Sequence, residues 1–266
     1  MSNVQKEKRL SLVGRVAIVT GGNRGIGSGI SLALAKAGAS VVICYRRDEA
    51  AAKDITAKIE GMGKKAIALQ ADITDCDKVK EIAAKTVDTF GKVDILVNNA
   101  GIASRGKNIL DTEAEEFHKL MEVHFFGALH FTQAVLPHMR KQGRGDIHFI
   151  SSLETIACLP GHGPYVMAKA AIEGMAKVLA KEELQNNIRV NIIAPGLVET
   201  EMGRRLVKAN VGRDIKELYP TMPFRRACQP SDIGNLCAFL CSEDGGYISG
   251  HVIYVDGGGT IGQMLV

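Results

Sequence analysis

Seven short apolar segments recur along this chain, and a longer stretch with helical periodicity separates each one from the next. They span residues 16–19, 41–44, 66–69, 95–97, 147–150, 189–193 and 252–255. Strands that are buried on both faces read as continuous apolar runs, and strands that alternate with helices are typical of βαβ units. The pattern therefore predicts an α/β fold, a doubly wound Rossmann-type domain whose seven-stranded parallel sheet carries helices on both faces.

The chain reads as one folded unit. Its 266 residues contain no Pro/Ser-rich linker, internal repeat or low-complexity block, and this length suits one large α/β domain. Residues 1–12 are predicted to form a polar N-terminal tail, and residues 13–266 a single Rossmann-fold domain.

Composition and charge argue against several classes of partner. The net charge of +4 is spread along the chain, whereas nucleic-acid binding needs clustered Lys and Arg. No apolar run approaches the ~20 residues that span a bilayer, and no signal peptide precedes the first strand. We therefore expect a cytoplasmic protein without a nucleic-acid or membrane partner.

The cysteines indicate free thiols in a reducing compartment rather than a disulfide framework. They form no Cys-x-x-Cys pair and no metal-ligand spacing, so no metal is expected. Two of them lie four residues apart in an apolar helical stretch and read as buried thiols. His148, within a predicted strand, reads as a packed or surface side chain rather than a catalytic one. The six cysteines are Cys44, Cys76, Cys158, Cys228, Cys237 and Cys241.

A glycine-rich turn joins the first strand to the first helix. Residues 20–27 read Thr-Gly-Gly-Asn-Arg-Gly-Ile-Gly. Glycines permit a tight turn and let the backbone approach a diphosphate, while the N-terminus of the next helix offers unpaired N–H groups to an anion. The turn predicts a dinucleotide site, and an ordinary βα turn is the alternative.

The end of the second strand indicates which dinucleotide is preferred. An acidic residue there would hold the ribose hydroxyls of NAD, but the sequence reads Tyr45, Arg46 and Arg47, with Asp48 displaced beyond them. Two guanidiniums, together with Arg24 in the glycine turn, can bind a 2′-phosphate through charge-assisted hydrogen bonds. We expect NADP(H) to be preferred and NAD(H) to be possible; a solvated basic start to the next helix is the alternative.

Tyr165 and Lys169 lie four residues apart, and Ser152 precedes Tyr165 by thirteen. Helical positions i and i+4 share one face. A tyrosine with a pKa of about 10 is a poor base at neutral pH, and a neighbouring ammonium favours its phenolate form. The three residues predict a proton-transfer site, although a Tyr/Lys pair alone is common on solvated helices.

Together these residues resemble the short-chain dehydrogenase/reductase family across about residues 12 to 260. The glycine turn matches the family motif Thr-Gly-xxx-Gly-x-Gly, and residues 98–101 match Asn-Asn-Ala-Gly. The segment with Ser152 and Tyr165-xxx-Lys169 matches the catalytic motif. Residues 195–200, which begin with Pro-Gly, match the nicotinamide loop, and residues 256–258, Asp-Gly-Gly, match the closing motif.

The resemblance implies a role for each matching residue. Ser152 would polarise the substrate carbonyl, Tyr165 would be the general acid in reduction, and Lys169 would lower the pKa of Tyr165 and hold the nicotinamide ribose. The implied cofactor-binding residues are Gly21, Asn23, Arg24, Gly25, Ile26, Gly27, Tyr45, Arg46, Arg47, Asp72, Ile73, Asn99, Ala100, Gly101, Tyr165, Lys169, Pro195, Gly196, Val198 and Thr200.

His124 departs from the family pattern. The family usually places an asparagine at this position, where it supports a water relay to the lysine. A histidine can donate and accept a hydrogen bond, and it titrates near neutrality in water. His124 therefore either carries the relay or leaves it broken with modest activity.

The substrate segment implied by the resemblance spans about residues 201 to 226 and mixes apolar with basic side chains. Met202 in that segment and Glu154 near Ser152 are candidate substrate contacts, beside Ser152 and Tyr165 themselves. Such a segment suits a hydrophobic ketone or an acyl group on a phosphorylated carrier. Loop cations that simply face water are the alternative.

These observations predict an NADPH-dependent oxidoreductase that reversibly reduces a ketone to a secondary alcohol by hydride transfer, with Tyr165 as proton donor. One alternative is a 3-oxoacyl-carrier-protein reductase or an NAD(P)-dependent steroid or secondary-alcohol dehydrogenase. Another is a catalytically impaired cofactor-binding protein. The resemblance also implies a homotetramer, or a homodimer, with helices at about 113–140 and 164–184 at one interface.

Overall fold

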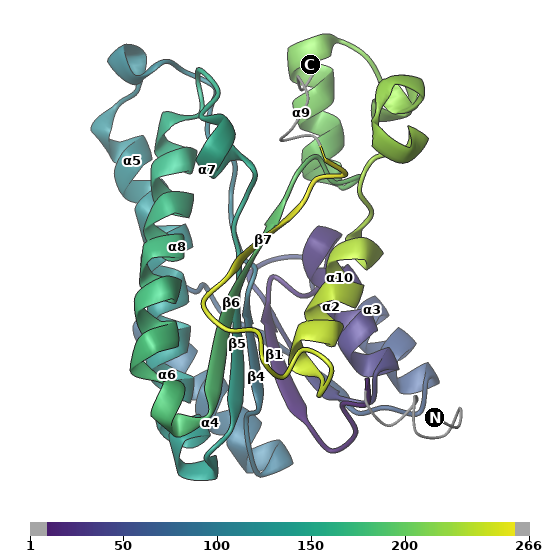
Figure 1. The fold of residues 1–266 in the computed structure, drawn as a ribbon, viewed down its shortest axis with the longest axis vertical. Coiled ribbons are helices and arrows are strands. Elements are labelled where there is room, and N and C mark those ends of the chain that lie inside the picture. The colour runs from purple at the N-terminus through teal and green to yellow at the C-terminus, as the bar shows by residue number, and fades with distance from the viewer. Residues whose placement is uncertain (1–9, 259–266) are drawn as a thin grey trace.

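A seven-stranded parallel sheet forms the centre of the protein in the computed structural model, which describes residues 10–258 (Figure 1). The strands lie in the order β3-β2-β1-β4-β5-β6-β7, and every neighbouring pair is parallel. The predicted sheet is confirmed, and each predicted apolar segment lies within a strand. The strands are β1 (Val16–Thr20), β2 (Ser40–Tyr45), β3 (Ala66–Gln70), β4 (Ile95–Asn98), β5 (Gly145–Ile150), β6 (Ile188–Pro195) and β7 (Val252–Val255).

Helices cover both faces of this sheet, as predicted (Figure 1). Each layer of helices encloses its own apolar core against the strands. On one face lie α4 (Cys76–Phe90), α6 (Gly127–Gln142) and α8 (Gly163–Glu182), and on the other lie α2 (Gly25–Lys36), α3 (Glu49–Gly61) and α10 (Pro230–Cys241).

Shorter elements occupy the connections. None of the helices between residues 10 and 258 combines the length and apolarity needed to cross a membrane. These shorter elements are the α-helices α5 (Ala114–Met121), α7 (Glu154–Ala157) and α9 (Glu201–Val211), the π-helix η2 (Glu122–Phe126), and the 3₁₀ helices η1 (Ile109–Asp111), η3 (Leu184–Asn186), η4 (Ile215–Thr221) and η5 (Pro223–Arg225).

Local sequence sets the helix ends. Asp75 precedes α4, and its carboxylate accepts hydrogen bonds from the backbone N–H groups of Asp77 and Lys78. Such a cap satisfies donors that have no partner inside the helix. Gly91 ends α4 in the left-handed conformation, with φ of 80°, which glycine adopts without strain. The boundaries of α4 are therefore encoded next to its amphipathic face.

The folded part of the chain starts before the predicted boundary at residue 13. Leu12 is fully buried, and its backbone N–H donates to the carbonyl of Ala37 at 2.7 Å. Residues 1–9 of the predicted tail, like residues 259–266, lie outside the described residues. Leu12 thus belongs to the core next to α2 rather than to the tail.

The strand order places the binding crevice. β1 lies between β2 and β4, so the direction in which successive strands are added reverses at β1 and β4. In open parallel sheets, ligands bind beyond the carboxyl ends of the strands at such a reversal. The segments that follow β1, β4, β5 and β6 meet there, and they carry most of the predicted site residues.

Candidate active site

The glycine turn after β1 leads directly into α2. Arg24 precedes the helix in an extended conformation and makes no side-chain cap, so the first N–H groups of α2 are available to an anion. A Cβ on Gly27 would lie 2.1 Å from the carbonyl oxygen of Gly21. Only glycine fits at that position, which lets the turn stay as tight as a diphosphate cradle requires. The turn therefore suits a dinucleotide.

The loop after β4 is fastened to this turn. The Thr20 hydroxyl accepts from the backbone N–H groups of Asn99 and Ala100, both at 2.9 Å. The Asn99 amide donates to the carbonyl of Thr20 at 2.8 Å and to that of Gly21 at 3.3 Å. The Asn99 side chain thus connects the two loops. It would contribute to a cofactor site by positioning the glycine turn.

The basic segment after β2 is also tied to the turn. Asn23 donates from its side-chain amide to the carbonyls of Arg47 and Asp48, both at 3.2 Å. The exposed Arg46 forms an ion pair with Asp72 at 3.5 Å. Within the described part of the chain, Arg47 is exposed and pairs with no carboxylate. Arg47 is therefore the better placed of the two arginines to receive an added anion.

Two predicted cofactor residues differ from their expected surroundings. Tyr45, at the end of β2, is buried in the core with α2 and α3, so its ring packs below the crevice. Arg24 lies 3.8 Å from Glu201 at the start of α9, and both side chains are largely exposed. An arginine in the turn therefore faces the segment beyond β6 rather than the basic pair after β2.

Lys169 and Tyr165 lie together on α8, as their spacing predicts. The Lys169 ammonium donates to the carbonyl of Ile150 at 2.6 Å and lies 5.6 Å from the centroid of the Tyr165 ring. Ser152 follows β5, and its hydroxyl accepts from the backbone N–H of Glu154 at 3.2 Å. The carboxyl end of β5 and the first turns of α8 thus bring the three predicted catalytic residues to one place.

Burial dominates the pKa values of this pair. It raises the pKa of Tyr165 to about 12, against the opposing effect of a hydrogen bond with Ser152. It lowers the pKa of Lys169 to about 7, against the opposing charge of Glu173. The pKa of Tyr165 therefore lies above its ordinary value in this structure, because desolvation of the phenolate is the largest cause acting on it. In this state Tyr165 holds its proton and is poised as an acid.

His124 lies in the π-helix η2, where the chain that was expected to form one helix over residues 113–140 is interrupted. Its side chain is buried, and its Nε2 lies 2.8 Å from the carbonyl oxygen and 3.2 Å from the backbone nitrogen of Ile102. The shorter contact places the proton on Nε2, which donates to that oxygen. Its Nδ1 has no hydrogen-bond partner among the described residues.

The expected titration of His124 near neutrality is wrong for this structure. Burial lowers its pKa to about 3, and the charge of Lys169 lowers it further, whereas the Ile102 carbonyl acts in the opposite direction. A neutral imidazole with a free lone pair on Nδ1 can accept a hydrogen bond. His124 therefore has the chemistry of a fixed acceptor rather than of a proton carrier.

A small cavity separates His124 from Lys169. It offers about 10 Å³ to the centre of a water-sized sphere, which is at the lower limit for one water molecule. Asn98 also lines it, and its side-chain oxygen is a second buried acceptor without a partner in residues 10–258. The lining residues are Thr20, Ile73, Asn98, Ala100, His124, Ala128, Ile150, Lys169 and Ile172.

Sequence reasoning missed a buried carboxylate behind the catalytic helix face. Glu173 is one helical turn after Lys169 and is only 7% exposed. Its Oε1 accepts from the hydroxyls of Ser151 at 2.6 Å and Thr155 at 2.9 Å. The sequence did contain a signal for this carboxylate, because a glutamate lies four positions after the lysine within an apolar run. Glu173 raises the pKa of Lys169 and fixes the segment on either side of Ser152.

The segment after β6 is anchored by Glu199. Its carboxylate accepts from Arg204 at 2.9 Å, from Gln229 at 2.9 Å and from the Tyr219 hydroxyl. The Tyr219 hydrogen bond is the main cause that lowers the pKa of Glu199 to about 2. Thr200 then caps α9 by accepting from the backbone N–H of Gly203 at 3.0 Å. This anchor holds the loop that contains Val198 and Thr200.

The candidate substrate contacts lie on both sides of the crevice. Met202, on α9, exposes 48% of its surface. Glu154, on α7, pairs with His162 at 3.0 Å and adds to the rise in the pKa of Tyr165. The structure therefore exposes an apolar side chain on α9 and places a polar pair near Tyr165.

Comparison with known proteins identifies close similarity over nearly the whole chain. A family model described as enoyl-(acyl carrier protein) reductase matches residues 21–260. The chain is 36% identical over 259 residues to oxidoreductase UcpA of Salmonella typhimurium, covering 96% of this chain and 97% of that protein. It is 34% identical over 264 residues to dehydrogenase/reductase SDR family member 4 of Sus scrofa, covering 99% and 93%.

Solved structures show the same similarity. A 7α-hydroxysteroid dehydrogenase complexed with NADH and 7-oxo glycochenodeoxycholic acid superposes with a TM-score of 0.88, at 35% identity, over 97% of this chain and 98% of that one. A dehydrogenase/reductase from Sinorhizobium meliloti gives a TM-score of 0.85 at 30% identity, over 96% and 98%. Both the fold and the sequence are thus shared along the full described length.

Proposed function

We propose, since this chain belongs to the short-chain dehydrogenase/reductase family, that it is an NADPH-dependent reductase of ketones. As a member of that family it is an NAD(P)-dependent oxidoreductase. The observation that carries the proposal is the meeting of Tyr165, Ser152 and Lys169 at the carboxyl edge of the sheet, where burial keeps the pKa of Tyr165 high. Such a group can give a proton to a carbonyl oxygen that is gaining charge.

The residues of this chain supply the proton and its support. NADPH, when bound, supplies the hydride that reaches the carbonyl carbon. The hydroxyls of Ser152 and Tyr165 are assigned to the carbonyl oxygen, where each donor preorganised toward the developing charge contributes roughly 3 kcal/mol to the transition state. Tyr165 gives its proton to that oxygen, and Lys169, in its charged form, stabilises the phenolate that remains.

The same arrangement supports resupply of the proton. The cavity beside Lys169 is lined by His124 and Asn98, each of which has a buried acceptor without a partner in residues 10–258, Nδ1 and the side-chain oxygen respectively. An acceptor orients a neighbouring O–H or N–H group without having to titrate. We assign to His124 the role that the family usually gives to asparagine, with its acceptor turned toward the cavity next to Lys169.

We further propose that NADP(H) is preferred. Arg47 is exposed without a carboxylate partner in the described residues, and Arg46 lies beside it. Asn23 holds the backbone of this segment against the glycine turn that receives the diphosphate. NAD(H) remains the alternative, since a similar steroid dehydrogenase was solved with NADH.

For the substrate we propose a hydrophobic ketone. The exposed Met202 supplies an apolar contact, while the Glu154–His162 pair supplies a polar one near Tyr165. A 3-oxoacyl thioester is the second candidate, because a 3-oxoacyl-[acyl-carrier-protein] reductase of Synechocystis is 35% identical over 249 residues. A steroid ketone is the third, on the similarity to the 7α-hydroxysteroid dehydrogenase.

The test is an assay of NADPH oxidation with a panel of aliphatic ketones, 3-oxoacyl thioesters and oxosteroids. We expect turnover with at least one class, and loss of that turnover in Tyr165→Phe. NADPH binding without turnover of any class would instead identify a catalytically impaired cofactor-binding protein. A faster reaction with NADH than with NADPH would reverse the cofactor assignment alone.

We also propose that the chain assembles through α8 into a homotetramer or homodimer and works in the cytoplasm. Met167 and Val178, on one side of α8, expose 54% and 56% of their surfaces, and the exposed Ala170 and Gly174 lie between them. An apolar stripe of this kind is typical of a buried helix face. Sedimentation of Val178→Glu should show dissociation if this face is the interface. The free thiols suit a reducing compartment.

A further inference from the structure

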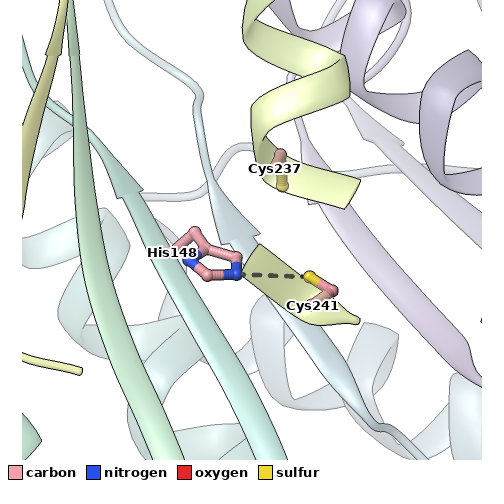
Figure 2. A group of neighbouring side chains, drawn as sticks. All are labelled: His148, Cys237 and Cys241. Carbon is pink, nitrogen blue, oxygen red and sulfur yellow. Dashed lines mark hydrogen bonds between the residues drawn. The ribbon is translucent and has the colours of Figure 1, made fainter. Parts of the chain in front are cut away.

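Three side chains that commonly bind metals lie together in the core (Figure 2). His148 comes from β5, and Cys237 and Cys241 lie one turn apart on α10. All three are fully buried. Their ligand atoms lie within 4.8 Å of one another, and the Nε2 of His148 is 3.2 Å from the Sγ of Cys241.

We propose that His148, Cys237 and Cys241 form a binding site for a thiophilic divalent ion, Zn²⁺ in the first place. Zinc lies about 2.3 Å from a thiolate sulfur and about 2.0 Å from an imidazole nitrogen, so its ligand atoms are roughly 3.4–3.8 Å apart in a tetrahedron. The His148–Cys241 pair is already within 0.2 Å or so of that range. Small side-chain rotations would bring the three atoms around one centre, with a water molecule as the fourth ligand of the tetrahedron.

The charges of such a site balance. Two thiolates and a neutral imidazole around Zn²⁺ give a net charge of zero, and each thiol that binds releases its proton to solvent. This balance matters because the surroundings are the apolar core between the sheet and α10, which contains Leu240 and Val97. An uncompensated ion would be costly there, whereas a neutral assembly is not.

The cluster contains a buried polar group with few hydrogen bonds. Among the described residues, the only hydrogen-bond partner of the His148 ring is the thiol of Cys241, and its Nδ1 has none. A thiol is a weak hydrogen-bond partner. A buried imidazole with so little compensation is destabilising, and a metal bond to Nε2 would supply what the thiol does not.

The site would act on the fold rather than on the reaction. His148 lies four residues before Ser152, roughly 13 Å along the strand direction, so the ion would not reach the substrate. It would link β5 to α10, which packs closely on the glycine-turn helix α2. A Cys-x-x-x-Cys pair alone does not indicate metal binding, and only the sheet brings His148 to it.

Cobalt titration of the full-length protein tests the proposal. The protein is stripped of metal with a chelator under reducing conditions and titrated with Co²⁺. We expect one equivalent per chain to give the visible bands of tetrahedral cobalt and a sulfur-to-cobalt charge-transfer band, both abolished by Zn²⁺. Zn²⁺ at a hundredfold its Kd should raise the Tm by roughly 5–10 °C.

The variants assign the ligands. Cys237→Ala/Cys241→Ala should lose both the cobalt bands and the Tm shift, whereas Cys158→Ala, at an exposed cysteine, should keep them. His148→Phe retains the thiols and the side-chain volume, and should weaken Co²⁺ binding at least tenfold. If the double cysteine variant does not fold, His148→Phe alone tests whether the cluster binds the ion. Absence of the cobalt bands in the unaltered protein, or their persistence in the double variant and in His148→Phe, would overturn the proposal and leave a thiol–imidazole hydrogen bond.

Discussion

The ring of His124 stands perpendicular to the ring of Tyr165, with an interplanar angle of 89° and 5.4 Å between the ring centroids. Edge-to-face contacts of this kind contribute about 0.5–1.5 kcal/mol beyond the area that they bury. The same imidazole holds the Ile102 carbonyl through Nε2. A residue from η2 therefore packs against the Tyr165 ring while its other nitrogen remains available as an acceptor.

Replacing His124 separates these two contributions. We expect His124→Asn to preserve or improve kcat, because an amide also accepts a hydrogen bond, and His124→Ala to lower kcat by roughly 10- to 100-fold, as removal of an outer-shell partner commonly does. Initial rates of NADPH oxidation measure both. An unchanged kcat in His124→Ala would show that the side chain does not take part.

Tyr165→Phe removes the proton donor and leaves the ring packing in place. Turnover should fall at least about 100-fold, in line with the usual contribution of a general acid, while NADPH still binds. Steady-state rates and NADPH fluorescence measure the two properties. Tyr247→Phe, at a fully exposed tyrosine, is the matched control and should behave like the unaltered protein.

Glu173→Gln tests how the charge on Lys169 is maintained. Burial lowers the pKa of Lys169 to about 7, although the charge of Glu173 opposes this fall. The rate of reduction should therefore decline as the pH rises through about 7, because the ammonium loses its proton. Without the carboxylate charge the lysine pKa falls, and the decline should move to lower pH. The pH profile of kcat/KM measures it.

Glutamine keeps the acceptor that Ser151 and Thr155 use, so a purely structural role would leave that profile in place. Glu182→Gln, at the exposed end of the same helix, is the control and should not move the decline.

The two arginines after β2 should not be equivalent. The positive charge of Arg46 is partly neutralised by Asp72, whereas Arg47 faces solvent. We expect Arg47→Ala to raise the KM for NADPH by about 10- to 100-fold, the worth of a charge-assisted hydrogen bond, with little change for NADH. Arg46→Ala should do less.

Parallel kinetics with both cofactors provide the comparison, and Arg144→Ala, at an exposed arginine after α6, is the control. Equal effects of Arg47→Ala on the KM for NADPH and for NADH would refute a phosphate contact.

The sheet was predictable because strands that are buried on both faces have continuous apolar sequences. The apolar segment at 41–44 lies wholly within β2, and Tyr165 and Lys169 meet on α8 as their spacing requires. The Rossmann fold and the family followed from these local patterns and from their order along the chain.

Properties that depend on desolvation were not predictable. The pKa of Tyr165 rises and that of His124 falls because the surrounding protein desolvates both side chains, and desolvation is a property of the assembled fold. The π-helix η2 also breaks a segment whose composition reads as one continuous helix. Glu173 was overlooked because a single acid on an apolar face resembles a solvated residue until its partners are known.

Asn23 connects two parts of the crevice to which different functions are assigned. It bridges the glycine turn to the backbone of Arg47 and Asp48, so the diphosphate cradle and the basic segment form one mechanical unit. A change in the turn that displaced Asn23 would therefore break its hydrogen bonds to this backbone. Redesign of the cofactor preference therefore has to treat this unit as a whole, because exchanging the arginines alone leaves intact the amide that sets their distance from the turn.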